Sequence, residues 1–177
     1  MELSRSMTAT VYVIYQNKVL LHQHKKFGSL FPLGGHLERD ELPQEAAVRE
    51  VYEESGLHVT LYNPDERLPL SKGVQLDRPS CLYLENDSTE LQNIDFIYFA
   101  LASGGELNPQ AGESRNFCWL TQEQLLQRED IKPHIRETAL KALRTLAVEK
   151  DPSVSFQQIK DKVTAFLTER DWLRDRK

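Results

Sequence analysis

GHLERDELPQEAAVREVYEESGL, residues Gly35 to Leu57, is the most informative segment of this 177-residue chain. Seven of its residues stand at a set spacing, and two apolar residues accompany them. The seven are Gly35, Glu41, Arg49, Glu50, Glu53, Glu54 and Gly56, and the apolar pair is Val51 and Leu57. With average residue usage, chance would produce this pattern at a given start well below roughly once in a hundred million.

The second half of the segment predicts a helix from about Glu41 to Ser55. Pro43 suits the first helical turn, because its missing N–H would have no partner there. Gly56 stands where a helix commonly ends with a positive φ. The helical periodicity of about 100° per residue places carboxylates on one stripe and apolar side chains on another. The first stripe holds Glu50, Glu53 and Glu54, and the second, expected to face the core, holds Val48, Val51 and Tyr52.

The carboxylate stripe predicts a metal site. Like charges three or four residues apart on a helix repel by roughly 0.2–0.5 kcal/mol for each pair. Arg49 is the nearby cation, and no lysine follows at the favourable spacing, so an ordinary solvated acidic face is the weaker interpretation. A divalent cation would turn the repulsion into ligation, and carboxylate oxygens suit Mg²⁺ or Mn²⁺.

The complete pattern resembles the signature of the Nudix (MutT-like) hydrolases, with every fixed position matched. The resemblance covers about residues 8 to 148. It implies an α/β/α sandwich, in which a mixed β-sheet lies between the helix that carries the signature and additional C-terminal helices. It also implies a pyrophosphohydrolase that uses Mg²⁺, with Mn²⁺ as a substitute, on a nucleoside diphosphate linked to another moiety.

The resemblance implies a role for each matched residue. The metal ligands that it implies are Glu50, Glu53, Glu54 and the carbonyl oxygen of Gly35. Gly34 and Gly35 would form the loop that shapes the metal site, since paired glycines let the backbone pass close to a ligand. Glu41 would orient the carboxylates without binding the metal, and Arg49 would pair with one of them and fix its rotamer.

The general base has two candidate positions. Members of the family take it from the helix, here Glu50 or Glu53, or from a later loop glutamate. Glu113, in the segment QAGESR, is the loop candidate. An ordinary exposed loop residue is an equally good interpretation of Glu113.

Composition narrows the partners and the compartment. The net charge is −5 and the pI is about 5.6, which argues against duplex nucleic acid as a partner. We find neither a signal peptide nor an apolar run of membrane length, so we expect no membrane partner and a cytoplasmic location. Cys81 and Cys118 form neither a disulfide framework nor a metal motif, and we expect both to be buried.

Outside the signature, β-branched and aromatic runs predict strands. The predicted strands are residues 9–14, 19–21, 57–61, 93–101 and 117–120. The connection 62–82 is rich in turn residues and is expected to contain short strands. Asp95 lies inside the most apolar strand and needs a partner there, either in a substrate site or as a structural acceptor. His22 and His24 belong either to a polar strand end or to a phosphate contact.

The C-terminal part predicts helices. Thr121 is expected to cap one of them, and residues 131–148 show apolar side chains at helical spacing. After Pro152, Ser155 and Gln158 form a capping box for a last helix. We therefore divide the chain into a domain of residues 1–148 and a helical extension of residues 149–177. The extension would pack on the domain or at a dimer contact, so monomer and homodimer both stay open.

Two other functions on the same fold are alternatives to a hydrolase. A non-catalytic nucleotide-binding or regulatory module typically loses the glutamates of the signature, and this chain has all of them. An isomerase relative uses a cysteine in the glycine loop, which here reads FPLGGH from Phe31 to His36. Nucleoside triphosphates, ADP-sugars and capped RNA ends all stay open as substrates. Capped RNA ends have the least support, because the sequence shows no strip of basic and aromatic residues on which bases could stack.

Overall fold

The computed structural model describes residues 4–23, 28–86, 88–111 and 116–147. Contacts within the chain separate residues 1–147 from residues 148–177. The predicted C-terminal helix with Ser155 and Gln158 lies outside the described residues. In chain order the described elements are β1 (Ser4–Tyr15), β2 (Lys18–Gln23), β3 (Leu30–Phe31), β4 (Leu33–His36), α1 (Pro43–Ser55), β5 (Val59–Leu61), β6 (Cys81–Asn86), β7 (Leu91–Ala102), β8 (Phe117–Leu120), α2 (Gln122–Gln127) and α3 (Pro133–Leu146).

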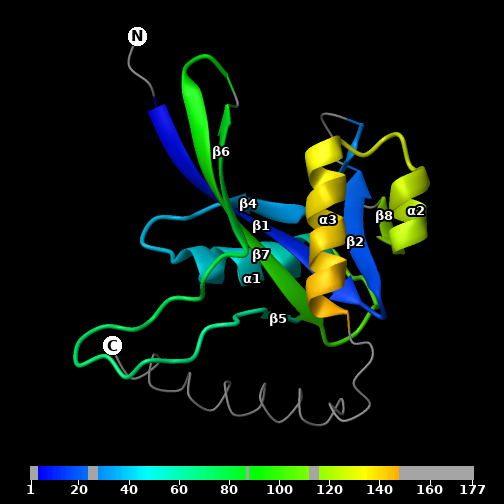
Figure 1. The fold of residues 1–177 in the computed structure, drawn as a ribbon. Helices are drawn as coiled ribbons and strands as arrows, with labels where there is room; N and C mark the ends of the chain where they lie inside the picture. Colours follow the sequence, from blue (N-terminus) through cyan, green and yellow to red (C-terminus); the bar gives the residue numbers. More distant parts are fainter. Residues whose placement is uncertain (1–3, 24–27, 87, 112–115, 148–177) are drawn as a thin grey trace, which may run out of the picture. The chain divides into compact units, whose positions relative to one another are not determined.

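The strands form one mixed sheet with β1 and β7 at its centre (Figure 1). The main order is β3-β2-β1-β7-β5, while β4 also pairs with β1, β6 with β7, and β8 with β2. β1 and β7 are parallel, in a register that runs from Ser4 opposite Leu91 to Ile14 opposite Leu101. The other pairings are antiparallel. The mixed sheet predicted from the sequence is therefore confirmed.

β1 begins five residues earlier than the apolar pattern predicts, at Ser4. This first part is polar, and side chains of β7 hold it by hydrogen bonds. Arg5 Nε donates to Gln92 at 3.1 Å, and Ser6 Oγ donates to Asn93 Oδ1 at 2.5 Å. Pairing with a neighbouring strand, which the periodicity of β1 alone cannot reveal, extends this strand.

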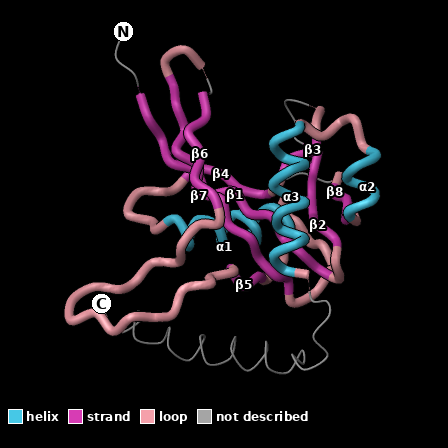
Figure 2. The backbone as a smooth tube through the Cα atoms, in the orientation of Figure 1, coloured by secondary structure: helices cyan, strands magenta, loops and turns pink. Residues whose placement is uncertain are grey.

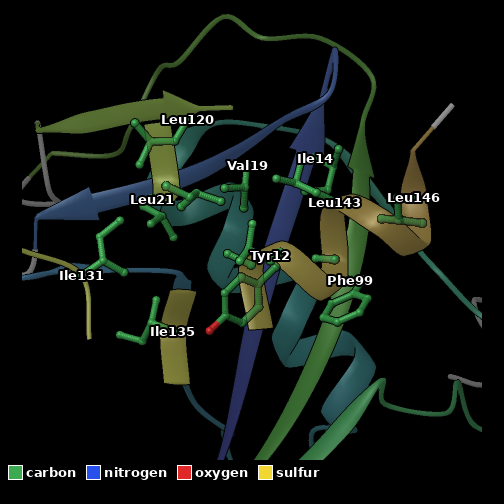
Figure 3. Packing of buried hydrophobic residues seen from close by; sticks show 14 of the residues in the cluster. Tyr12, Ile14, Val19, Leu21, Phe99, Leu120, Ile131, Ile135, Leu143 and Leu146 are labelled. Atoms are coloured by element: carbon green, nitrogen blue, oxygen red, sulfur yellow. The ribbon is translucent and has the colours of Figure 1, made fainter. Parts of the chain in front are cut away.

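Successive side chains of β1 enter two different cores, because a strand alternates its side chains between the two faces of a sheet. Ala9, Val11 and Val13 pack on the face that α1 covers. Tyr12 and Ile14 point to the opposite face, where they meet Phe99 of β7 together with Leu143 and Leu146 of α3 (Figure 3). The predicted order of layers, helix, sheet and helix, is confirmed.

The long connection between β5 and β6 differs from the prediction, because residues 62–80 contain no strand (Figure 2). Polar side chains hold this connection instead. Asp77 is only 7% exposed, accepts a hydrogen bond from Asn63 at 2.9 Å and forms an ion pair with Arg67. A buried carboxylate needs such partners.

The helices near the C-terminal end of the described chain begin at residues close to those predicted. Thr121 caps α2, since its hydroxyl accepts a hydrogen bond from the Gln124 amide at 3.3 Å. α3 is two residues shorter at each end than the predicted helix 131–148. Among the described residues, no helix has the length and apolar character that crossing a membrane requires.

Cys81 and Cys118 are free thiols, and each is only partly buried. The prediction of full burial is therefore wrong. Cys81 lies on β6, which covers only part of β7, and Cys118 lies on β8, which pairs only with β2 among the described strands. Side chains on such marginal strands have fewer neighbours than those of β1 or β7.

Candidate metal and catalytic site

The ends of α1 follow from local sequence, and they fix where its carboxylates lie. The amide of Leu42 donates to the Glu45 carboxylate at 3.1 Å, and Pro43 occupies the first turn. At the other end Gly56 has the left-handed φ of 75°, and its N–H donates to the Tyr52 carbonyl at 2.8 Å. The start at Pro43 and the end at Gly56 agree with the predicted helix.

One residue of α1 lies on a different face from that predicted. Tyr52 is 46% exposed, and its ring lies against His58 with 5.1 Å between ring centroids. The buried face of α1 consists instead of Ala46, Ala47, Val51 and Ser55. The small side chains of Ala46, Ala47 and Ser55 let the helix lie close to the sheet. The larger ring of Tyr52 lies instead beside the end of the helix, against His58.

Arg49 joins three carboxylates. Its Nε and Nη2 donate to the two oxygens of Glu41 at 2.8 and 2.9 Å, in a bidentate pair. Its Nη1 donates to Glu50 at 2.8 Å and to Glu53 at 3.0 Å. A further bond of 3.1 Å runs from Nη2 to the carbonyl of His36. A single guanidinium therefore gathers like charges that would otherwise repel one another.

The two glycines before the helix lie where no side chain fits. A Cβ at Gly35 would overlap the carboxylate of Glu50. A Cβ at Gly34 would overlap the backbone of Ala9, and the φ of Gly34 is 148°, which other residues rarely adopt. The Gly34 amide also donates to Glu54 at 2.8 Å. The glycine loop thus contacts two of the three carboxylates of the stripe.

The electrostatic environment differs among the carboxylates. Hydrogen bonds from Arg49 lower the pKa of Glu41 below its ordinary value. Burial raises the pKa of Glu50, although Arg49 acts in the opposite direction. The bidentate bond to Glu41 is the main reason that the pKa of Arg49 is raised, so the guanidinium stays charged. A further positive charge beside Glu50 would offset the effect of its burial.

The donor set fits a hard divalent cation. Glu50, Glu53, Glu54 and the backbone at Gly35 offer oxygen atoms only, which is the chemistry that Mg²⁺ and Mn²⁺ prefer. Among the described residues, no three His, Cys, Asp or Glu side chains are already arranged to hold a metal ion. Arg49 bonds to one oxygen of Glu50 and to one oxygen of Glu53. The second oxygen of each carboxylate could therefore bind a cation while these two bonds stay in place.

Glu113, the loop candidate for the general base, lies outside the described residues. The part of the loop that precedes it is attached to the end of α1. The Asn108 amide donates to the Ser55 carbonyl at 2.8 Å, and the Gln110 amide donates to the Glu53 carbonyl at 3.0 Å. This attachment was not predicted from the sequence. Its one signal is Gly56, since a Cβ there would overlap the backbone of Asn108.

Asp95 lies on the face of the sheet opposite α1. Asp95 is opposite Thr8 of β1. The next residue of β1, Ala9, packs under α1, so Thr8 and Asp95 point to the other face. Asp95 is 5% exposed and accepts a hydrogen bond from Thr8 Oγ1 at 3.0 Å and another from Thr10. Burial raises its pKa. Of its two interpretations, the structural acceptor agrees with these contacts, and the structure does not bring Asp95 together with the α1 carboxylates.

A second polar group on that face was not foreseen. Thr138 of α3 bonds to the hydroxyl of buried Tyr12, and its hydroxyl also lies 3.2 Å from the Tyr83 hydroxyl. His22 is buried on the other face of the sheet, where it stacks on Phe117 with 5.9 Å between ring centroids. His24 lies outside the described residues. Isolated hydroxyls in apolar strands carry little sequence signal, which is why this group could not be predicted.

Comparison with known proteins identifies the family to which this chain is similar. The model of the NUDIX domain family matches residues 5–142. The crystal structure of a NUDIX family hydrolase from Clostridium perfringens is 38% identical, covering 81% of this chain and 99% of that one, with a TM-score of 0.73.

Two further structures are similar at lower identity. The MutT protein from Methanosarcina mazei Go1 is 16% identical, covering 82% of this chain and 97% of that one, with a TM-score of 0.61. An ADP-ribose pyrophosphatase from Streptococcus suis is 16% identical, covering 84% of this chain and 96% of that one, with a TM-score of 0.53. At such identity these two support the fold alone.

Proposed function

Because the chain belongs to the Nudix family, we propose that it is a metal-dependent hydrolase of a phosphoanhydride bond. The substrate is a nucleoside diphosphate linked to another moiety, of the nucleoside triphosphate or ADP-sugar type. The observation that supports this best is the convergence of Glu41, Glu50 and Glu53 on Arg49, with Glu50 packed against Gly35. Ordinary acidic helix faces carry exposed charges and need no such arrangement.

In this proposal Glu50, Glu53, Glu54 and the Gly35 carbonyl hold the metal. Bound Mg²⁺ would neutralise the pyrophosphate and lower the pKa of water. The chain itself supplies positioning, which carries most of the rate in phosphoryl transfer. Arg49 keeps the side chains of Glu50 and Glu53 on the same side of α1, and Glu41 holds the guanidinium from its other edge. Gly34 and Gly35 let the loop lie close to the carboxylates of α1.

The proton from the attacking water goes to a carboxylate. Glu50 and Glu53 are the candidates on α1, and burial raises the pKa of Glu50, which favours its taking up a proton. Glu113 is the candidate in the loop, and the bond between Gln110 and the Glu53 carbonyl brings that loop to α1 three residues earlier. Substitutions of Glu50 and Glu113 distinguish these two positions for the general base.

The test is a hydrolysis screen with Mg²⁺ or Mn²⁺, with a parallel series in EDTA. The panel contains nucleoside triphosphates, ADP-ribose, ADP-sugars and dinucleoside polyphosphates, and phosphate is measured before and after a phosphatase is added. We expect turnover of one class that EDTA abolishes. Absence of turnover with every substrate, in protein that binds Mg²⁺ measurably, contradicts the proposal and favours a nucleotide-binding module.

A further inference from the structure

An apolar patch lies on the α1 face of the sheet, next to the part that α1 covers. Leu82 and Leu84 of β6 are 59% and 57% exposed, and Met7 of β1 is 51% exposed. The register places Leu84, Ile94 and Met7 in one row across three strands, and Leu82 beside Phe96 in the next row. We call these five residues the β6 patch. Single exposed apolar side chains are common, but contiguous ones mark interaction surfaces.

The β6 patch ends at an unprotected strand edge. Among the described residues β6 pairs with β7 alone, so its outer edge is open, and Figures 1 and 2 show β6, β7 and the start of β1 extending away from α1. Edge strands commonly carry Lys, Pro or a bulge that prevents pairing with other chains. β6 reads CLYLEN, and its one charged residue, Glu85, points to the face opposite Leu84.

We propose that β6 pairs with β6 of a second copy of this chain, antiparallel about a two-fold axis at Tyr83. In this register Leu82 of each chain lies opposite Leu84 of the other. The two β6 patches then form one apolar surface across a continuous sheet. Such an interface is isologous, because the same residues contribute from both copies.

The charges of β6 are complementary in this register. Glu85 lies opposite Cys81 of the second copy. In each chain Lys141 Nζ lies 3.3 Å from Cys81 Sγ and 3.3 Å from the Ser80 carbonyl oxygen. Glu85 therefore meets the ammonium of the second copy, and the symmetry forms this ion pair twice. Within one chain Glu85 and Cys81 are about 13 Å apart along the strand, so Glu85 does not reach its own Lys141 in this way.

The first experiment measures the mass of the full-length chain by analytical ultracentrifugation over a wide range of concentrations. We expect a monomer–dimer equilibrium that Leu84→Lys weakens by at least about tenfold. Leu126→Lys on α2 is the matched control, because Leu126 has the same 57% exposure as Leu84. The control should leave the equilibrium unchanged, and thermal unfolding of both variants checks that they fold.

The second experiment exchanges the charges. Glu85→Lys and Lys141→Glu should each weaken the dimer, and the double variant should restore it, because the ion pair then forms with reversed sign. Loss of packing by Lys141 would not be rescued by a change at position 85 of the same chain. The restoration therefore reports a contact between copies.

A wild-type chain that stays monomeric at every concentration overturns the proposal, and the β6 patch then serves another occupant. A dimer that resists Leu84→Lys also overturns it, because the interface lies elsewhere. A double charge exchange no better than the single variants contradicts the register. None of these readouts depends on hydrolysis, so they are independent of the proposed function.

Discussion

The backbone of Gly35 lies against the carboxylate of Glu50, with no room for a methyl group between them. Gly35→Ala should therefore push the Glu50 side chain away from its place beside the loop. We expect turnover to fall by roughly a hundredfold, which is typical of small misplacements in an active site. Steady-state kinetics on the substrate found in the screen measure this effect.

Gly104→Ala is the control for that substitution. No heavy atom lies within 4 Å of the position that its Cβ would take, so activity should stay near the wild-type rate. Equal losses in the two variants would show that glycine replacement in general, and not the contact with Glu50, lowers the rate.

Arg49→Lys should reduce activity although the charge is kept. An ammonium is a point charge and cannot replace the planar fork that bonds Glu41, Glu50 and Glu53 together. We expect a loss of about a hundredfold or more in kcat. Arg128→Lys is the control, since Arg128 pairs with Asp130 at the surface, with 40% and 44% of the side chains exposed. A full-rate Arg49→Lys enzyme would show that the three carboxylates do not need a common anchor.

Glu54→Gln should lower turnover by several orders of magnitude and leave the free energy of unfolding nearly unchanged. The amide oxygen of glutamine still accepts the bond from the Gly34 amide, but it no longer offers a charged ligand to a metal. Activity and Mg²⁺ binding are measured beside Glu137→Gln, an exposed change on α3. Near-wild-type hydrolysis by Glu54→Gln contradicts the assignment of this residue as a ligand.

Glu113→Gln separates the two positions of the general base. We expect a loss comparable to that of Glu50→Gln, because the preceding Gln110 attaches this loop to α1 at Glu53. Single-turnover rates of both variants are compared across pH. A small loss for Glu113→Gln places the base on α1.

Asp95→Asn should change how stability depends on pH. Burial raises the pKa of Asp95 in the folded state, so the folded protein holds this proton more tightly than the unfolded chain. The stabilising contribution is complete below the ordinary pKa of 3.8 and is lost as pH rises through the folded value. Wild type should therefore lose free energy of unfolding relative to Asp95→Asn as pH rises from 4. Urea titrations at several pH values measure the difference, and a constant difference contradicts the expectation.

Residues with strong local preferences could be read from the sequence. Pro43 and Gly56 mark the ends of α1, and Thr121 caps α2, because each of these acts within its own turn of chain. The layers of the fold followed from the resemblance to a family. Glu50 and Glu53 also lie on one side of α1, where both accept hydrogen bonds from Arg49.

Features that depend on distant partners were missed. Tyr52 was predicted to face the core but contacts His58 instead, and the segment Ser4–Thr8 is a strand because β7 pairs with it. The attachment of Asn108 to the end of α1 is likewise a contact across many residues. Such contacts have no periodicity in the sequence, so only the folded chain reveals them.

The alternation of β1 between two cores restricts changes in its length more than changes in its composition. Val11 and Tyr12 are neighbours in sequence, yet they belong to opposite layers of the domain. A single inserted residue before Val11 would exchange the two faces for half of the strand, since the period of a strand is two. The side chains of Val11 and Val13, which pack on the α1 face, would then point toward α3. The fold should therefore tolerate single substitutions in β1 better than insertions or deletions there.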